Sequence, residues 1–539
     1  MKLAEEIKKF FKGEVTDDEV TLKKYSRDAS LFEVKPKLVV YPKDSDDLKK
    51  LVKWVGENPG HSVTVRAAGS DMTGGPLNES IVADVTKYMN QMGEVVAEGT
   101  VVEPGMFYRD FERKTLEKKL ILPCYTASKD LCALGGMIAN NCAGEKTLRY
   151  GKMENFVLES KVIFSDGNEY TVKPLSIVAL DIKMAQGDFE GDVYKKMNEL
   201  LISNDELIRN AKPNISKNSA GYYLWNIKKD GFFNLNKLLV GSQGTLGIVT
   251  EAKIKLVPVE PISKLFVIFL KNLSPLAKLV NEILPTRPES IESYDDASLK
   301  LAMKFLPKYL FRFIPEALMM LRSGIPKMVL LVEYSGETEA EVDRKIATLH
   351  LKIASFGLVS RKITSEAEAE KYWTVRRESF NLLRKHVHGS RTAPFVDDVV
   401  VKPEDMPTFL PRMCAILDEY KLIYTIAGHA GNGNFHIIPL MDMKDRRNIR
   451  VIREVGEKVY SLVAEYHGSI TGEHNDGIVR TPYLNKMYSP EILELFKKTK
   501  EIFDPQNIFN PGKKVPASHE ATQGKGGTLE YLENHIAIE

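Results

Sequence analysis

The chain has 539 residues and a net charge of +2, with 75 basic and 73 acidic side chains. This length predicts roughly three or four domain-sized units, and the 43% hydrophobic and 27% charged fractions are ordinary for a soluble globular protein. The even charge balance argues against nucleic acid or an anionic membrane as the principal partner, and no apolar run reaches the ~18–20 residues of a membrane-spanning helix. We therefore expect a cytoplasmic protein without a transmembrane segment, for which peripheral membrane contact stays open.

The N-terminus and the cysteines narrow the class further. Residues 1–11 mix acidic and apolar side chains and predict a short amphipathic helix, because a signal peptide needs a continuous apolar core. The spacing of the cysteines fits neither a zinc site, nor an iron–sulfur cluster, nor a redox disulfide. We expect four reduced thiols, at Cys124, Cys132, Cys142 and Cys414.

The first elements in the chain lead into a glycine-bearing loop. Residues 38–41 predict a strand, residues 45–57 a helix, and residues 62–65 a strand that continues into the loop 66–75. Strand, helix, strand and glycine loop is an arrangement that presents backbone N–H groups to a phosphate. An ordinary surface turn is the alternative. Further strands are predicted at 81–85 and 94–103, and a charged helix at 107–119.

Two later stretches also carry few large side chains. Residues 134–144 are dense in Gly, Ala and Asn, which permits close backbone approach of a ligand; a buried helix packed through small residues is the alternative. Residues 159–164 and 169–172 predict a hairpin, and residues 175–229 an irregular polar insertion. Three glycines within residues 241–247 again indicate a backbone that faces a ligand.

From Leu265 the pattern changes to long strands that alternate with helices, which predicts an α+β domain with an antiparallel sheet ending near Ile470. The strands are expected at 265–270, 328–334 and 395–401, and the helices at 337–354 and 403–420. A helix at 490–502 follows, and the residues from 517 onward are expected to be poorly ordered.

Two histidines within residues 428–436 form the most distinctive motif. His429 and His436 are separated by glycines and asparagines, and apolar runs that predict strands flank both. The sequence Gly472-Glu473-His474 follows downstream. Two neutral imidazoles and one carboxylate form a ligand set for a divalent metal with an open position. Ordinary hydrogen-bonded histidines of a protein core are the alternative.

These stretches together resemble the FAD-linked oxidoreductases of the vanillyl-alcohol oxidase and p-cresol methylhydroxylase superfamily. Residues 66–75, 135–144, 241–247 and 503–513 are similar to its flavin-binding segments. The motifs at 428–436 and 472–474 resemble Gly-His-x-Gly-Asp-Gly-Asn-x-His and Gly-Glu-His of its D-lactate, D-2-hydroxyglutarate and glycolate dehydrogenase branch. The resemblance covers nearly the full chain, about residues 38–513.

The resemblance implies an α+β fold with a two-subdomain FAD-binding domain of the p-cresol methylhydroxylase type and an antiparallel-sheet α+β substrate domain. The expected limits are 1–260 for the FAD-binding domain, 261–475 for the substrate domain with the metal site, 476–516 for a segment that returns to the FAD-binding domain, and 517–539 for a tail.

The resemblance also implies the roles of individual residues. His429, His436 and Glu473 are the implied metal ligands, for Zn²⁺ first and Mn²⁺ or Fe²⁺ as alternatives, and His474 is the implied general base. Arg376, in a Trp-x-x-Arg helix, is the expected partner of the substrate carboxylate, ahead of Arg377 and Arg480. Non-covalent FAD is expected to contact Arg66, Ala68, Gly69, Ser70, Gly74, Gly75, Pro123, Ser128, Gly135, Gly136, Asn140, Asn141, Ala143, Gly144, Gly241, Ser242, Gly244, Thr245, Gly247 and Asn510.

Some positions depart from the family pattern. Ala67, Ser70 and Gln243 replace a glycine, a threonine and a glutamate of the flavin-binding segments. Asn432 replaces the aspartate of the metal motif, and it is not expected to be a ligand. Residues 475–477, Asn-Asp-Gly, are similar to larger members that carry a fused iron–sulfur domain.

The resemblance implies FAD-dependent, metal-assisted oxidation of a D-2-hydroxy acid to the 2-oxo acid, with hydride transfer to flavin N5. Electrons would then pass to an electron-transfer flavoprotein, a quinone or an iron–sulfur subunit. One alternative is a non-redox flavoenzyme like alkyl-glycerone-phosphate synthase, although the chain lacks a His-His-His run. Another is a non-catalytic FAD-binding subunit of a larger oxidase.

Overall fold

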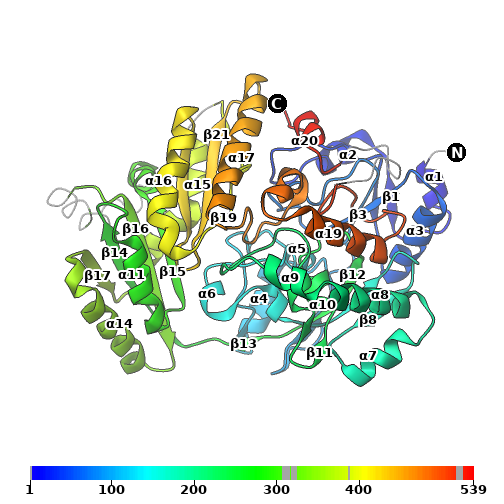
Figure 1. Ribbon diagram of the computed structural model, residues 1–539, viewed down its shortest axis with the longest axis horizontal. Helices are drawn as coiled ribbons and strands as arrows, with labels where there is room; N and C mark the ends of the chain where they lie inside the picture. The colour runs from blue at the N-terminus through cyan, green and yellow to red at the C-terminus, as the bar shows by residue number, and fades with distance from the viewer. Residues whose placement is uncertain (1–2, 306–315, 317–323, 387–388, 517–525, 539) are drawn as a thin grey trace.

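The structure is a computed structural model that describes residues 3–305, 316, 324–386, 389–516 and 526–538. Figure 1 shows an eight-stranded sheet with its helices on one side of the molecule and several smaller sheets on the other. The small sheets come from the first half of the chain, and the C-terminal helix α19 (Pro490–Phe503) lies among them. The mixture of helices and antiparallel sheets confirms the predicted α+β class.

The first small sheet has the strand order β1-β2-β4-β3. Strands β2 and β3 each pair in parallel with β4, and β1 pairs antiparallel with β2. Helix α3 (Ser45–Glu57) begins where the Asp44 carboxylate accepts a hydrogen bond from the Asp47 N–H, and it buries Leu48, Leu51 and Val55. The strands are β1 (Glu14–Thr16), β2 (Leu38–Tyr41), β3 (Val63–Arg66) and β4 (Ile81–Asp84).

The second small sheet is antiparallel, in the order β5-β12-β7-β8. The predicted hairpin is confirmed, because β7 (Val157–Ile163) pairs with β8 (Glu169–Val172). The strand predicted at 94–103 is wrong for most of its length, since only β5 (Thr100–Val102) is extended in the sheet. The remaining elements here are α4 (Tyr108–Leu116), α5 (Leu134–Asn140) and β12 (Ile248–Ile254).

The prediction of an irregular insertion at 175–229 is wrong. The segment forms three helices, and α8 buries Val193, Tyr194 and Met197. These residues recur at helical spacing, but many polar residues between them hide the pattern. The helices are α7 (Ile177–Met184), α8 (Phe189–Ser203) and α9 (Asp205–Ala211).

The large sheet runs in the order β17-β14-β16-β15-β20-β21-β18, with β19 paired to β21. Every neighbouring pair is antiparallel, as predicted. The strands are β14 (Ile262–Leu270), β15 (Ser290–Asp295), β16 (Met328–Gly336), β17 (Val359–Ile363), β18 (Arg391–Thr392), β19 (Val399–Val400), β20 (Ile423–His429) and β21 (Asn434–Met441).

Within the strand predicted at 395–401, only β19 is paired in the sheet. Asp398 has a φ of +66°, which a continuous strand does not allow. The backbone therefore leaves the extended conformation at Asp398, just before β19 begins.

Successive side chains of the large sheet point to opposite faces, and each face packs against its own layer of helices. On β14, Phe266 and Ile268 join a cluster with helices α11, α14, α16 and α17, whereas Leu265 and Val267 join a cluster with α12 and α15. The predicted helices at 337–354 and 403–420 are confirmed as α14 and α16. The layers comprise α11 (Leu276–Ile283), α14 (Glu339–Ile353), α16 (Met406–Glu419) and α17 (Arg447–Glu465) on one face, and α12 (Asp296–Phe305) and α15 (Glu366–His386) on the other.

The end of the chain returns to the first half. Phe509 forms a parallel bridge with Val63 at the edge of the first sheet. Residues 517–525 lie outside the described residues, but residues 526–538 contain α20 (Leu529–Asn534) and bury Leu532 and Ile536, so poor ordering was wrongly predicted for them. Among the described residues, no helix is both long and apolar enough to span a membrane.

Candidate active site

One cavity of about 670 Å³ joins the glycine-rich loops to the histidine hairpin. This volume lies within the range of cofactor and ligand pockets. One part of the cavity is lined by the loop 66–75, helix α5 and the loop 241–247. Another part is lined by α15, β20, β21 and the loop that carries Glu473. The predicted FAD contacts that line the cavity are Arg66, Ala68, Gly69, Ser70, Gly75, Ser128, Gly135, Gly136, Asn140, Ala143, Ser242, Gly244 and Gly247.

Two glycines of this lining, Gly136 and Gly244, leave room for a ligand. A Cβ built on Gly244 would meet nothing within 4 Å, and one on Gly136 would meet only Ala67 at 3.9 Å. Backbone is therefore exposed to the cavity at both positions, as a flat cofactor or a pyrophosphate requires. Most of the small-residue stretch 134–144 forms helix α5, as the alternative of a helix packed through small residues predicts. The glycines of this helix nevertheless line the cavity.

Asp71 holds the first glycine loop in shape. One carboxylate oxygen accepts hydrogen bonds from the Thr73 and Gly75 N–H groups, each 2.8 Å long. Its other oxygen accepts from Asn140 Nδ2 on α5, at 2.7 Å. The loop and the helix that both line the cavity are thus tied together before any ligand binds.

Arg66 is less available than the sequence pattern implies. Its guanidinium donates to the backbone carbonyls of Tyr25 and Arg27, at 3.3 and 2.8 Å, and lies over the Tyr25 ring. Arg66 therefore braces the segment between β1 and β2 while also lining the cavity.

The other predicted FAD contacts lie behind the lining and support it. Asn510 Nδ2 donates to the carbonyls of Gly75 and Gln243, at 3.0 and 2.7 Å, and so joins two of the loops. A Cβ on Gly144 would lie 1.8 Å from the Tyr125 carbonyl oxygen, which explains that glycine by close packing. The predicted contacts outside the lining are Gly74, Pro123, Asn141, Gly144, Gly241, Thr245 and Asn510.

The histidine motif forms a β-hairpin, as predicted. Strands β20 and β21 pair so that His429 is opposite Asn434 and Ala427 is opposite His436. The two imidazoles therefore lie on one face of the sheet, the α15 face, with ring centroids 5.3 Å apart. Gly433, with a φ of +64°, makes the turn, where a Cβ would lie 1.9 Å from the Val401 carbonyl oxygen.

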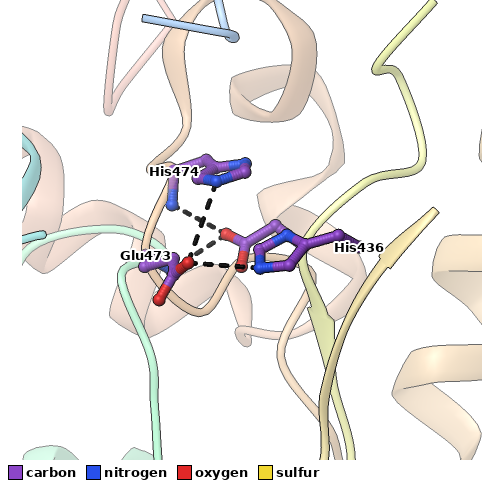
Figure 2. A group of neighbouring side chains, drawn as sticks. His436, Glu473 and His474 are labelled. Carbon is purple, nitrogen blue, oxygen red and sulfur yellow. Dashed lines mark hydrogen bonds and ion pairs between the residues drawn. The ribbon is translucent and has the colours of Figure 1, made fainter. Parts of the chain in front are cut away.

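Glu473 joins the histidines from a separate loop. Its Oε1 lies 3.3 Å from His429 Nε2 and 3.3 Å from His436 Nε2, and 3.9 Å from His474 Nε2. In Figure 2, dashed lines join the Glu473 carboxylate to the rings of both His436 and His474. Three ring nitrogens and one carboxylate oxygen converge, which is the donor chemistry of a transition-metal or zinc site. The segment that carries Glu473 is a loop.

The opposite ring nitrogens face carboxylates that the sequence analysis missed. His429 Nδ1 lies 2.6 Å from Glu292 Oε1 on β15, and His436 Nδ1 lies 3.2 Å from Asp397 Oδ1. A carboxylate at Nδ1 leaves Nε2 of the ring available to bind a metal. Asp397 Oδ2 also lies 2.7 Å from His474 Nδ1, although within the described structure this contact lacks hydrogen-bond geometry.

Asp398 also lies close enough to His436, Glu473 and His474 to share a metal with them, within 4.8 Å. Its oxygens are already engaged, because they accept hydrogen bonds from Glu473 N, His474 N and the side chains of Thr471 and Asn434. Asp398 therefore shapes the Glu473 loop, and His429 completes the better ligand set.

The carboxylates make the site favourable for positive charge. Burial alone would lower the pKa of His436, but Asp397 and Glu473 outweigh it and raise that pKa to about 10. Burial would also lower the pKa of His474, yet the charges of Asp398 and Asp397 raise it above its usual value. The pKa of Glu473 is held well below normal, against its burial, by Lys217 and His429. A divalent cation bound here would meet the same attraction.

The three arginines differ in their relation to the cavity. Arg376 on α15 lines it, and its Nε donates to Glu292 Oε2 at 2.9 Å. Arg377 also lines it and pairs with Glu145 at 2.8 Å. Arg480 is buried outside the lining and donates to the backbone carbonyls of Asn475 and Asp397, so it does not reach toward a substrate.

Solved structures of known enzymes share this fold. The chain is similar to p-cresol methylhydroxylase, with a TM-score of 0.68 at 15% identity, covering 93% of both chains. It is equally similar to an alkyldihydroxyacetonephosphate synthase, with a TM-score of 0.68 at 16% identity, covering 94% of this chain and 85% of that one. At these identities the likeness defines the fold alone, and the fold is that of the p-cresol methylhydroxylase class.

Sequence comparison then gives the family. Residues 36–173 match the FAD binding domain family, and residues 262–514 match the family of FAD linked oxidases, C-terminal domain. The chain is 30% identical over 513 residues to D-2-hydroxyglutarate dehydrogenase of Pseudomonas putida, covering 93% of this chain and 50% of that protein. It is 26% identical to glycolate oxidase subunit GlcD of Bacillus subtilis, covering 91% of both. The chain belongs to the FAD-linked oxidoreductases of the p-cresol methylhydroxylase type.

The lengths of these relatives differ. The chain spans about half the length of the D-2-hydroxyglutarate dehydrogenases of Pseudomonas putida, Escherichia coli and Pantoea ananatis, but 96% of the length of the one from Stutzerimonas stutzeri. It spans nearly the whole of the glycolate oxidase subunits.

Proposed function

We propose that this protein binds FAD and a divalent metal and oxidises a D-2-hydroxy acid to the 2-oxo acid. The observation that carries the proposal is one continuous cavity, which is lined both by the glycine-bearing loops and by the cluster of His429, His436 and Glu473. The names of the relatives, D-2-hydroxyglutarate dehydrogenase and glycolate oxidase subunit, support the substrate class.

Each group would be held by residues that fit it. The loops 66–75 and 241–247 and helix α5 would hold FAD, which supplies the acceptor for the hydride from the substrate carbon. His429, His436 and Glu473 would hold the metal, Zn²⁺ first and Mn²⁺ or Fe²⁺ as alternatives, and the metal supplies Lewis-acid attraction for the substrate hydroxyl and carboxylate.

His474 is proposed as the base that accepts the hydroxyl proton. It lies next to Glu473 and stacks on His436, with ring centroids 5.0 Å apart. Its side chain is 23% exposed, against 7% for His429 and for His436, so a proton taken up there has a route to solvent. Asp397 lies at its Nδ1, which orients the ring and favours the protonated form as it develops.

Arg376 is proposed to bind the substrate carboxylate. Its guanidinium lies in the cavity lining, beside Glu292, which in turn contacts His429. A planar guanidinium matches a carboxylate with two parallel N–H donors, and this fixes the direction of the bound hydroxy acid.

The domain limits are proposed as predicted, at 1–260, 261–475, 476–516 and 517–539. The proposed electron acceptor is a separate electron-transfer flavoprotein, quinone or iron–sulfur subunit. The relative from Bacillus subtilis is named as an oxidase subunit, which supports an acceptor on another chain.

The experiment is an anaerobic screen of FAD-loaded protein against matched D- and L-hydroxy acids, followed by flavin absorbance. We expect D-lactate, glycolate or D-2-hydroxyglutarate to bleach the flavin, the L-enantiomers not to, and His436→Ala to remove the response. Bleaching that is unchanged in His436→Ala would refute the metal-assisted reaction. FAD-loaded protein that no hydroxy acid reduces would favour the non-catalytic subunit.

A further inference from the structure

A short segment from the middle of the chain places a buried lysine behind the cluster of His429, His436 and Glu473. Residues 216–221 lie between the two stretches that match family domains, 36–173 and 262–514. Ser216 Oγ donates to the Asn432 carbonyl in the hairpin turn, at 2.6 Å, and Ser219 N donates to the Thr471 carbonyl beside the Glu473 loop, at 2.9 Å. The segment therefore touches both chain elements that supply the proposed ligands.

Lys217 is the residue that this segment places against Glu473. Its side chain is fully buried, and its Nζ donates to Glu473 Oε2 at 2.8 Å and to Asn434 Oδ1 at 3.1 Å. Lys217 is not part of the cavity lining, so it lies behind the carboxylate and not beside a bound substrate. A buried ion pair of this kind is costly to break, because the remaining charge is left without a partner.

The two oxygens of Glu473 thus have different surroundings. Oε1 faces the Nε2 atoms of the histidines, whereas Oε2 accepts the hydrogen bond of Lys217. A carboxylate can bind a metal through one oxygen or through both, and two-oxygen binding occupies a further coordination position. A hydroxy acid needs two such positions, one for its hydroxyl and one for its carboxylate.

We propose that Lys217 is a positioning residue that restricts Glu473 to one metal-binding oxygen and so keeps coordination positions open for the substrate. The proposal rests on the metal site of the proposed function. It predicts that loss of Lys217 leaves the metal bound but lets Glu473 occupy a position that the substrate needs.

Lys152 offers a matched control. It is a second buried lysine at the same loop, and its Nζ donates to the Gly472 carbonyl at 2.7 Å and to the Asn218 carbonyl at 3.0 Å. Lys152→Met therefore removes a buried ammonium and its hydrogen bonds to two backbone carbonyls and to Ser219 Oγ, while Oε2 of Glu473 keeps Lys217.

The test counts the water molecules on bound Mn²⁺. FAD-loaded protein is stripped with a chelator and reloaded with Mn²⁺, and water-proton relaxation measures the exchangeable waters on the metal. Oxalate, a chelating dianion that is not oxidised, is then titrated to displace them. We expect Lys217→Met to bind Mn²⁺ with about one fewer exchangeable water and to bind oxalate about tenfold more weakly or worse. Lys152→Met should keep the wild-type water number.

Each contrary result has a distinct meaning. Wild-type water number and oxalate affinity in Lys217→Met would overturn the positioning role and leave the metal site standing. Lys217→Met that loses FAD, while Lys152→Met retains it, would assign Lys217 a general role in folding and also overturn the proposal. Wild-type protein that binds no Mn²⁺ and no Zn²⁺ would remove the metal site and the positioning role together.

Discussion

Asp397→Asn tests the orientation of two histidines by one buried carboxylate. The Asp397 oxygens lie 3.2 Å from His436 Nδ1 and 2.7 Å from His474 Nδ1, so the substitution keeps the shape and removes the charge and one acceptor. Outer carboxylates of this kind typically contribute about 10–100-fold to metal affinity, or about 1.4–2.7 kcal/mol. We expect Zn²⁺ affinity, measured by competition with a chromophoric chelator, to fall by that factor.

The control for this variant is Asp295→Asn on β15, another carboxylate of the same sheet. Asp295 accepts hydrogen bonds from Ile426 N at 2.8 Å and from Ser298 N at 2.8 Å, and it lines no part of the cavity. Its Zn²⁺ affinity should equal that of the wild type. Equal affinity in Asp397→Asn would refute the reasoning, because it would mean that His436 needs no carboxylate at Nδ1 to bind the metal.

Three further predictions concern proton transfer, the cofactor and the substrate. Carboxylate charges raise the pKa of His474, and a base acts in its neutral form, so kcat/KM should fall as the pH is lowered. Asp397→Asn should move this fall to lower pH. A fall that stays at the same pH would contradict the role of His474 as the base. Gly136→Val should weaken FAD binding about tenfold or more, measured by flavin fluorescence titration, because its side chain enters the cavity. The neighbouring substitution Gly135→Ala is the contrast to Gly136→Val. It should lower the free energy of unfolding by about 1–3 kcal/mol in denaturant titrations, because its Cβ would crowd Pro104. Arg376→Lys should raise KM for the hydroxy acid about tenfold, and an unchanged KM would exclude Arg376 as the carboxylate partner.

The parts of the site that could be predicted from sequence are those with a local signal. Gly433 and the strands on either side of it form the hairpin that aligns His429 with His436, and all of this information lies within residues 423–441. The glycines that line the cavity were likewise visible as short Gly- and Ala-rich stretches next to strands.

The supporting charges could not be predicted because they come from distant parts of the chain. Glu292 is 137 residues from His429, and Lys217 is 256 residues from Glu473, so only the folded sheet brings them together. Asp397 and Asp398 did leave a trace, as two acids inside an otherwise apolar run. That run was interpreted as a continuous strand, and the positive φ of Asp398 is what interrupts it.

Helix α8 illustrates a different limit. Its buried residues follow helical spacing, but the polar residues between them made the whole segment appear irregular. Helix α8 packs against its neighbours α7 and α9 and also against α19, which begins more than 280 residues later in the chain, so part of what covers its apolar face is not visible in the local sequence.

The central claim is that the flavin and the metal act on the same bound hydroxy acid in one cavity. The most direct measurement is anaerobic stopped-flow reduction of the flavin by the active D-2-hydroxy acid, in protein that retains FAD but has been stripped of metal, before and after Zn²⁺ or Mn²⁺ is restored. We expect reduction to be lost on stripping and to recover with about one metal ion bound per chain. Equal reduction rates in stripped and reloaded protein would contradict it.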